Sequence, residues 1–170
     1  LADFQGIKSR APENPINIAE LEALGCIPTP MAWNELYTGL QQGTVDGLVS
    51  SKMPIIQQGL IDVLKYATDT NHSYSINVIL ISSAKYNSFS EEQRAAYDKA
   101  IAGAEEEWKI AMKEEEDSVQ KIKELQEQGK ILYTELTDEA RAEIKEAMVA
   151  ATEPKVEEMC GKEILETFRN

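Results

Sequence analysis

Residues 90–129 contain no proline and a single internal glycine, Gly103, and this stretch limits the possible folds more than any other part of the chain. It opens with SEEQ, the pattern of a capping box at a helix start. Apolar residues then recur at steps of three, four or seven, as on one face of an α-helix. The face comprises Tyr97, Ile101, Ala104, Trp108, Met112, Val119, Ile122 and Leu125, and we expect Trp108 to lie in a core. At about 1.5 Å per residue, such a helix would reach roughly 60 Å, which exceeds the width of one small domain.

The residues before position 83 alternate between short strand-like and helix-like segments. Asn17 followed three residues later by Glu20 has the pattern of a helix cap, and a glycine ends each of the first two predicted helices. Helices are predicted over IAELEAL, AWNELYTGLQQG and MPIIQQGLIDVL. Strands are predicted within GIKSRAPENP, around Lys8 and Arg10, and over CIPTPM, TVDGLVSS, KYAT and INVILI (76–81). This order is typical of an α/β layer with a largely parallel sheet.

The pattern changes after residue 83, so we predict two parts. The first, residues 1–83, is an α/β ligand-binding lobe segment. The second, residues 84–170, contains the long helix and a strand over ILYTEL that crosses back to the first part. An acidic helix then starts at Thr137 and runs towards Pro154, and a short helix ends at Phe168.

Composition excludes several classes of function. A net charge of −13 leaves no basic stripe to neutralise phosphates, so we expect no nucleic-acid partner. No apolar run is long enough to span a bilayer. His72 is the only histidine, and no phosphate loop, CxxC or dinucleotide motif occurs, so we expect neither an enzyme nor a metal or cofactor. Cys26 and Cys160 are predicted to be two independent thiols, although a long-range disulfide is the open alternative.

Two cations stand in the short segment GIKSRAPENP of this acidic chain. Side chains alternate along a strand, so Lys8 and Arg10 should point the same way. One interpretation is an edge strand that charge protects from pairing. The other is a cation that is held at a strand end to meet an anion. Trp33 has two interpretations as well, because it opens a helix directly after a loop and could belong either to the core or to a pocket wall.

These segments resemble a known family. GIKSRAP and the block ALGCIPTPMAWNELYTGLQQGTVDGL are similar to the second half of the solute-binding proteins of tripartite ATP-independent periplasmic (TRAP) transporters, the dicarboxylate-binding subunit family. The later segments TNHSYS, FSEEQRAAYDKA and LQEQGKILYTEL look like the same family, so the resemblance covers essentially the whole chain. The block from Pro28 to Gly47 carries most of its specificity.

The resemblance implies a fold and a function. The expected fold class is α/β: a periplasmic-binding-protein (type II-like) lobe with a mixed, mainly parallel sheet, plus a very long helix and carboxy-terminal helices. The expected function is that of a periplasmic receptor that binds a small organic acid and delivers it to membrane permease subunits. By this resemblance Arg10 pairs in bidentate fashion with the ligand carboxylate, a geometry to which a guanidinium is suited, and Lys8 is the solvated neighbour. The family's amino-terminal lobe is missing, so we expect the chain to be a carboxy-terminal portion.

One departure from the family pattern bears on the ligand. After Asp-Gly the family shows an asparagine that reaches the ligand, whereas Ser50 stands at this place here. A hydroxyl is shorter and donates once, and Leu48 and Val49 beside it are apolar, so the pocket should differ from that of a plain C4-dicarboxylate binder. The remaining candidate ligand contacts are Trp33, Asn71 and His72; the alternative for His72 is a structural role in a hinge.

A different class of function competes with the receptor. The long acidic helix could make the chain a helical interaction protein, although the α/β segments before Ser50 would then have no purpose. Without the amino-terminal lobe, part of the apolar face would lack cover, so we expect these 170 residues to self-associate through the long helix. With half of the pocket missing, we also expect the isolated chain to bind the ligand weakly or not at all.

Overall fold

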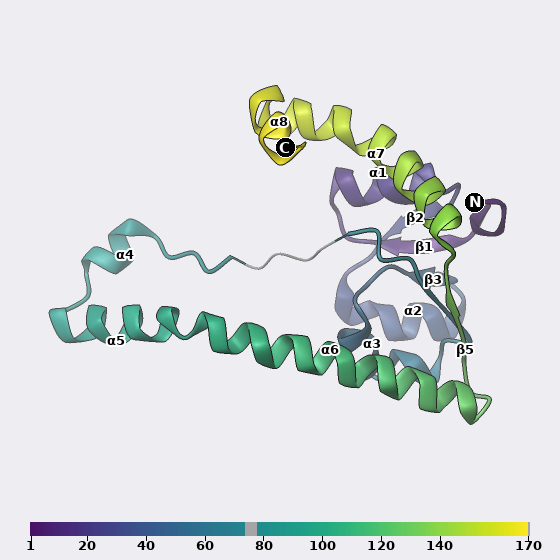
Figure 1. Ribbon diagram of the computed structural model, residues 1–170, viewed down its shortest axis with the longest axis horizontal. Coiled ribbons are helices and arrows are strands. Elements are labelled where there is room, and N and C mark those ends of the chain that lie inside the picture. Colours follow the sequence, from purple (N-terminus) through teal and green to yellow (C-terminus); the bar gives the residue numbers. More distant parts are fainter. Residues whose placement is uncertain (74–77, 170) are drawn as a thin grey trace.

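An α/β body and a long projecting helical arm make up the protein (Figure 1). The computed structural model describes residues 1–73 and 78–169. Its strands are β1 (Lys8–Ala11), β2 (Ile27–Pro30), β3 (Gly47–Leu48), β4 (Tyr66–Asp69) and β5 (Leu132–Glu135). Its α-helices are α1 (Pro15–Ala23), α2 (Leu36–Gln42), α3 (Lys52–Gln57), α4 (Ser83–Asn87), α5 (Glu91–Ala102), α6 (Ala104–Glu127), α7 (Asp138–Cys160) and α8 (Lys162–Arg169). Short 3₁₀ turns are η1 (Ala2–Phe4), η2 (Trp33–Glu35) and η3 (Leu60–Asp62).

The main sheet has the strand order β2-β1-β3, and both pairings are parallel. Arg10 lies opposite Thr29 of β2 and Leu48 of β3. The chain leaves β1 for β2 on one side, passes through α2, and returns to β3 on the other side of β1 (Figure 1). The strand order therefore reverses between β1 and β3. In open α/β sheets, ligands bind beyond the carboxyl ends of the strands at such a switch point.

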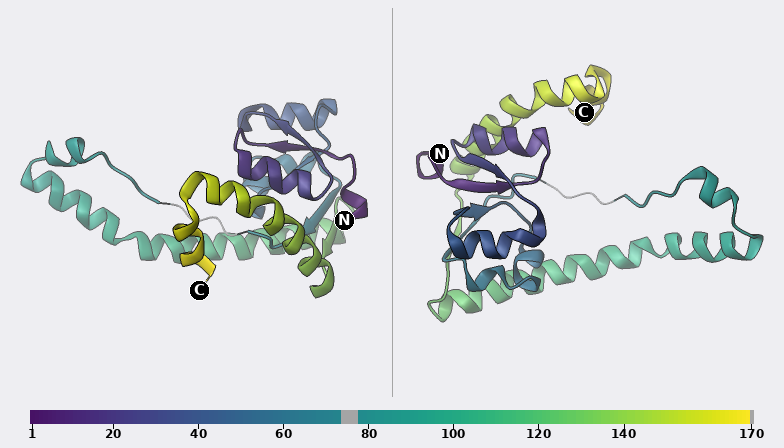
Figure 2. Two further views of the ribbon diagram at one scale, coloured as in Figure 1. Left: turned by 90° about the horizontal axis from the view of Figure 1, so that it is seen from above. Right: turned by 180° about the vertical axis from the view of Figure 1, so that it is seen from behind.

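Helices cover both faces of this sheet. α1 and α7 lie on one face and α2 on the other, as the two further views also show (Figure 2). The core on the first face joins Ala11 of β1 to residues of α1 and α7, namely Leu21, Leu24, Ile144 and Met148. The core on the second face contains Leu36, Val45 and Leu60. α7 thus returns from the far end of the chain to complete the body.

A second sheet pairs β4 with β5 in parallel, with Tyr66 opposite Leu132 and Asp69 opposite Glu135. A mainly parallel α/β fold is thereby confirmed, but β4 does not join the first sheet as the segment order suggested. β3 is two residues long and offers little edge for a further strand, whereas β5 matches β4 over its full length. Ile122, Leu125 and Ile131 form the third core beside this pair.

Local sequence patterns predicted the starts of two helices, α5 and α7, correctly. Ser90 and Gln93 form the predicted capping box at the start of α5, and the Thr137 hydroxyl accepts from the Ala140 amide at the start of α7. The first helix differs: it begins at Pro15, and its cap is Asn14, whose Oδ1 accepts from the Ile16 amide at 2.8 Å. Proline suits the first helical position because its missing N–H would have no partner there. The expected cap at Asn17 is therefore wrong.

The predicted long helix is present as two helices nearly in line, α5 and α6, which meet at Gly103 (Figure 1). Residues 78–112, comprising α4, α5 and the first part of α6, project away from the body; we call this segment the arm. Trp108 is 63% exposed there, so its expected place in a core is wrong. Within the arm, the apolar face packs only locally: Tyr97 contacts the rings of Tyr86 and Phe89, whereas Trp108 and Met112 stay exposed. Burial begins in the part of α6 near Ile122.

Two further expectations are corrected. Residues 78–81 form no strand, and Leu80 is 86% exposed; residues 76 and 77 of the predicted strand lie outside the described residues. A strand needs a partner edge, and nothing in the described chain lies alongside this segment (Figure 2). The acidic helix does not stop near Pro154 but continues as α7 to Cys160. Cys26 is buried and Cys160 exposed, and both thiols are free, as predicted.

Candidate ligand-binding site

The predicted ligand contacts Arg10, Trp33 and Ser50 lie near the ends of three neighbouring strands of the main sheet or after them. Arg10 lies near the end of β1, Trp33 opens η2 after β2, and Ser50 comes two residues after β3. Because the three strands are parallel, these residues lie beyond the same edge of the sheet. This carboxyl edge includes the switch point between β1 and β3, where the topology favours a ligand site.

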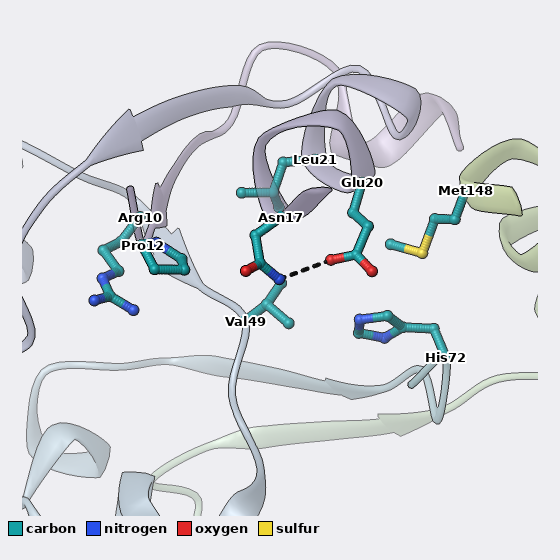
Figure 3. Close-up of a pocket in the computed structure, with 8 residues that line it drawn as sticks. All are labelled: Arg10, Pro12, Asn17, Glu20, Leu21, Val49, His72 and Met148. Atoms are coloured by element: carbon teal, nitrogen blue, oxygen red, sulfur yellow. Dashed lines mark hydrogen bonds between the residues drawn. The ribbon is translucent and has the colours of Figure 1, made fainter. Parts of the chain in front are cut away.

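A small cavity of about 110 Å³ opens at this edge (Figure 3). Its walls come from the end of β1, from α1, from the segments after β3 and β4, and from α7. The lining residues are Arg10, Pro12, Asn17, Glu20, Leu21, Val49, His72 and Met148. Five separate segments thus meet here, and we refer to this cavity as the Arg10 pocket.

Arg10 is held in one orientation by its neighbours. It lies on the face of β1 opposite the buried Ala11, and its Nε donates to the carbonyl oxygen of Met31 at 2.9 Å. Its Cζ lies 5.4 Å from the centroid of the Trp33 ring, within the range of a cation–π contact. Burial lowers the pKa of Arg10, because removal from water penalises the charged form, yet a guanidinium stays charged at neutral pH. Within residues 1–73 and 78–169, no carboxylate forms an ion pair with it.

The Nε contact leaves the two Nη nitrogens available. A guanidinium carries five N–H donors in a fixed plane, and the Met31 carbonyl accepts one of them. The pair of Nη groups matches the two oxygens of a carboxylate. Lys8, on the same face of β1, is engaged elsewhere: its Nζ donates to the Gly43 carbonyl at 2.9 Å and lies 3.9 Å from Asp46. Arg10 is therefore the better placed of the two cations to receive an anion.

The other end of the Arg10 pocket holds Glu20 and His72 (Figure 3). Asn17 Nδ2 donates to Glu20 Oε2 at 2.9 Å, so the two residues that resembled a helix cap instead form a side-chain pair within α1. His72 Nδ1 lies 2.6 Å from the Thr70 hydroxyl. Burial lowers the pKa of His72, and the negative charge of Glu20 offsets part of this effect. The net effect disfavours the charged form of the imidazole.

The structure brings together only some of the predicted site residues. Arg10 and His72 line the same pocket, and Trp33 packs both against Arg10 and against the core of Leu36. Trp33 does not line the Arg10 pocket, so its interpretation as a pocket wall stays a prediction. Ser50 and Asn71 are exposed and do not line the Arg10 pocket. Their roles as ligand contacts stay predictions.

Sequence reasoning missed Glu20, Asn17 and Met148 as pocket residues. The Asn17–Glu20 spacing fits a helix cap equally well, so the spacing alone does not indicate a place in a pocket. Met148 comes from α7, and no local pattern could link it to β1. In residues 1–73 and 78–169, no group of three or more His, Cys, Asp or Glu side chains is arranged to hold a metal ion.

Comparison with known proteins defines the family. Residues 1–159 match the bacterial extracellular solute-binding proteins, family 7. The chain belongs to this family, which confirms the resemblance to TRAP solute-binding proteins and the expectation of a binding protein rather than an enzyme.

Relatives of assigned function are similar over almost the whole chain. The C4-dicarboxylate-binding periplasmic protein of Rhodobacter capsulatus is 30% identical, over 95% of this chain and 48% of that protein. The ectoine-binding periplasmic protein TeaA of Halomonas elongata is 32% identical, over 98% of this chain and 49% of that protein. These relatives are periplasmic, in agreement with the predicted location, and among the described helices none is both long and apolar enough to cross a membrane.

Solved structures agree with the fold. A TRAP periplasmic solute-binding protein from Sulfurospirillum deleyianum with bound succinate superposes with a TM-score of 0.88 at 27% identity, over 98% of this chain and 54% of that one. The ectoine-binding protein of Halomonas elongata gives a TM-score of 0.85 at 31% identity, over 97% and 53%. The chain therefore spans about half the length of the relatives that it matches.

Proposed function

We propose that this chain supplies part of an extracytoplasmic receptor that binds a small organic acid through its carboxylate and delivers it to the membrane permease of a TRAP transporter. The observation that carries the proposal is the set of contacts that Arg10 makes. Its guanidinium is fixed by Met31 and Trp33 at the switch point of the sheet, and no acid of the described chain pairs with it. Charged and oriented donors at such a place suit an anionic ligand.

The shape of the Arg10 pocket supports a receptor of two lobes. A cavity of about 110 Å³ is small for a ligand site, because pockets that enclose a small molecule typically measure roughly 300 Å³ or more. The relatives are about twice as long as this chain. We propose that the rest of such a protein closes over the Arg10 pocket and that permease subunits recognise the closed form.

Within this proposal, the other predicted contacts have different roles. His72 lines the pocket, and Trp33 can offer an apolar surface next to the carboxylate held by Arg10. Ser50 follows β3 at the same edge, where domain closure could bring a ligand within reach of its hydroxyl. Asn71 precedes His72 and has a left-handed backbone with φ of 45°, so its contribution to the site would be to orient this segment.

The proposal is tested by identifying the solute that the full-length gene product carries. The protein is purified without denaturation, small molecules are released by heat or acid, and mass spectrometry identifies them. A carboxylic acid in the wild type that is depleted in an Arg10→Ala variant is the expected result. Lys8→Ala serves as the matched control, since it removes a cation from the same face of β1 and should retain the solute. Release of a nucleotide, or of an acid whose amount is unchanged in Arg10→Ala, would contradict the proposal.

A further inference from the structure

The two ends of the Arg10 pocket carry opposite charges. Arg10 lies at one end and Glu20 at the other, with Asn17 and Val49 between them (Figure 3). A ligand anchored to Arg10 by a carboxylate would therefore extend towards an acidic side chain. The chemistry of that far end restricts what the ligand can carry.

Glu20 is not neutralised by the protein around it. Its Oε2 accepts from Asn17 Nδ2, which is an uncharged donor. In the part of the chain that the structure describes, no lysine, arginine or histidine lies within ion-pairing distance of Glu20. His72 lines the same end, and burial lowers its pKa, which disfavours the charged form of the imidazole. The carboxylate thus has unused acceptor positions, since a carboxylate can accept about four hydrogen bonds.

We infer that the solute is a carboxylic acid whose far end carries a hydrogen-bond donor, either a hydroxyl or an ammonium-like group, and that Glu20 selects for this donor. The inference rests on the proposed function and narrows the solute class for that same site. A second carboxylate would face Glu20 and be repelled by it, because like charges that share a partly buried site oppose each other. A donor instead fills an acceptor position that water would otherwise occupy.

The test uses matched sets of acids and the full-length gene product. Each set keeps the chain length and changes only the far end: succinate, 4-hydroxybutyrate and 4-aminobutyrate form one set, and adipate, 6-hydroxyhexanoate and 6-aminohexanoate the other. The acid released from the purified protein is included as a further probe. Calorimetry should show at least about tenfold tighter binding of a donor-bearing acid than of the dicarboxylate of equal length. That ratio corresponds to about 1.4 kcal/mol.

Two variants separate the role of Glu20 from a general charge effect. Glu20→Gln removes the charge with almost no change of shape, and it should reduce the preference to within about threefold. Glu22→Gln removes the same charge from an exposed position of α1 and should leave the ratio unchanged. If Glu20→Gln does not fold, the wild-type ratio and the identity of the released acid still decide the question.

The outcomes distinguish this inference from the proposed function. Three results would overturn the selection by Glu20 and leave carboxylate binding at Arg10 intact. The dicarboxylates could bind as tightly as the donor-bearing acids, the affinity ratio could be unchanged in Glu20→Gln, or the released acid could be a dicarboxylic acid without a donor. If no acid of either set binds and no acid is released, the proposed function itself is contradicted.

Discussion

Arg10, the proposed anchor for the ligand carboxylate, is held in place by two neighbouring residues. The Met31 carbonyl fixes the plane of its guanidinium, and the Trp33 ring covers one side of it. A side chain that is already ordered loses less conformational entropy on binding, which leaves more of the interaction energy for affinity.

The first prediction concerns this anchor. Arg10→Lys in the full-length gene product keeps the positive charge but loses the two parallel N–H donors and the bond to Met31. We expect a loss of binding free energy of about 2 kcal/mol or more, measured by calorimetry with the solute identified by mass spectrometry. Lys8→Arg, a control on the same face of β1, should change the dissociation constant by less than about twofold, since Lys8 contacts Gly43 and Asp46 instead. Unchanged affinity in Arg10→Lys would mean that another group anchors the carboxylate.

The second prediction concerns His72 and pH. Burial lowers the folded-state pKa of His72 below its unfolded value of about 6.5. Between these two pKa values the unfolded chain binds more protons, so stability should fall as the pH drops below about 6.5. Urea unfolding of the wild type and of His72→Gln between pH 7.5 and 5, on the order of half-unit steps, measures this effect. On acidification, the free energy of unfolding should decrease more in the wild type than in His72→Gln. If the free energy depends on pH in the same way in both proteins, His72 does not cause the loss of stability.

At the scale of elements, an ion-pair network fixes α6 to the body. Lys52 Nζ of α3 lies 3.3 Å from Asp69 of β4 and 3.3 Å from Glu115 of α6. The side chains of Lys52 and Asp69 are 18% and 16% exposed. Tyr133 of β5 donates its hydroxyl to Asp69 at 3.0 Å, and burial, together with this bond to a carboxylate, raises the pKa of Tyr133. Three elements therefore meet at Lys52 near the base of the arm, and β5 joins the network through Asp69.

The third prediction follows from this network. Lys52→Met leaves two carboxylates close together without their cation, so we expect the free energy of unfolding to fall by about 2 kcal/mol. Hydrogen exchange should show the loss of protection in the second half of α6 first. Lys109→Met is the matched control, because Lys109 pairs with Glu106 on an exposed helix face, and its loss should cost no more than about 0.5 kcal/mol. Equal effects of the two substitutions would contradict a stabilising role for the Lys52 network.

At the scale of the whole molecule, the arm is the least covered part of the described chain. Trp108, Ile110 and Met112 of α6 are exposed, as are Val78, Ile79 and Leu80 on the segment that leads into α4. Contiguous apolar surface is rare on soluble monomers beyond a few hundred Å². The net charge of −13 opposes aggregation, but it does not hide an apolar face.

The fourth prediction is that the 170-residue chain self-associates through the arm. Light scattering at micromolar concentration should give a mass above the 19.0 kDa of one chain. Trp108→Gln should shift the mass towards the monomer, whereas Lys113→Gln, at an exposed position of the same helix, should not. A monomer in the wild type would contradict the prediction. In the same sample, tight binding of the solute would contradict the expectation that half of the pocket is too little for affinity.

Much of the local structure of this protein could be predicted from the sequence. Gly43, with a left-handed φ of 71°, ends α2 where it was expected, and Ser90 caps α5. The position of Arg10 near the end of a strand also followed from the segment order and from the family resemblance. Such features depend on residues that are close in the sequence, so the chain itself carries the information that specifies them.

Tertiary structure alone decided the rest. Met148 and His72 reach the Arg10 pocket because α7 and the segment after β4 return to the edge of the main sheet, and no spacing in the sequence encodes that meeting. β4 pairs with β5 because β3 offers too short an edge. Trp108 lies on an apolar helix face in the sequence but is exposed in the fold, since an apolar face is buried only where another surface is present to pack against it. Periodicity shows which residues can be buried, whereas the arrangement of the whole chain determines which of them are.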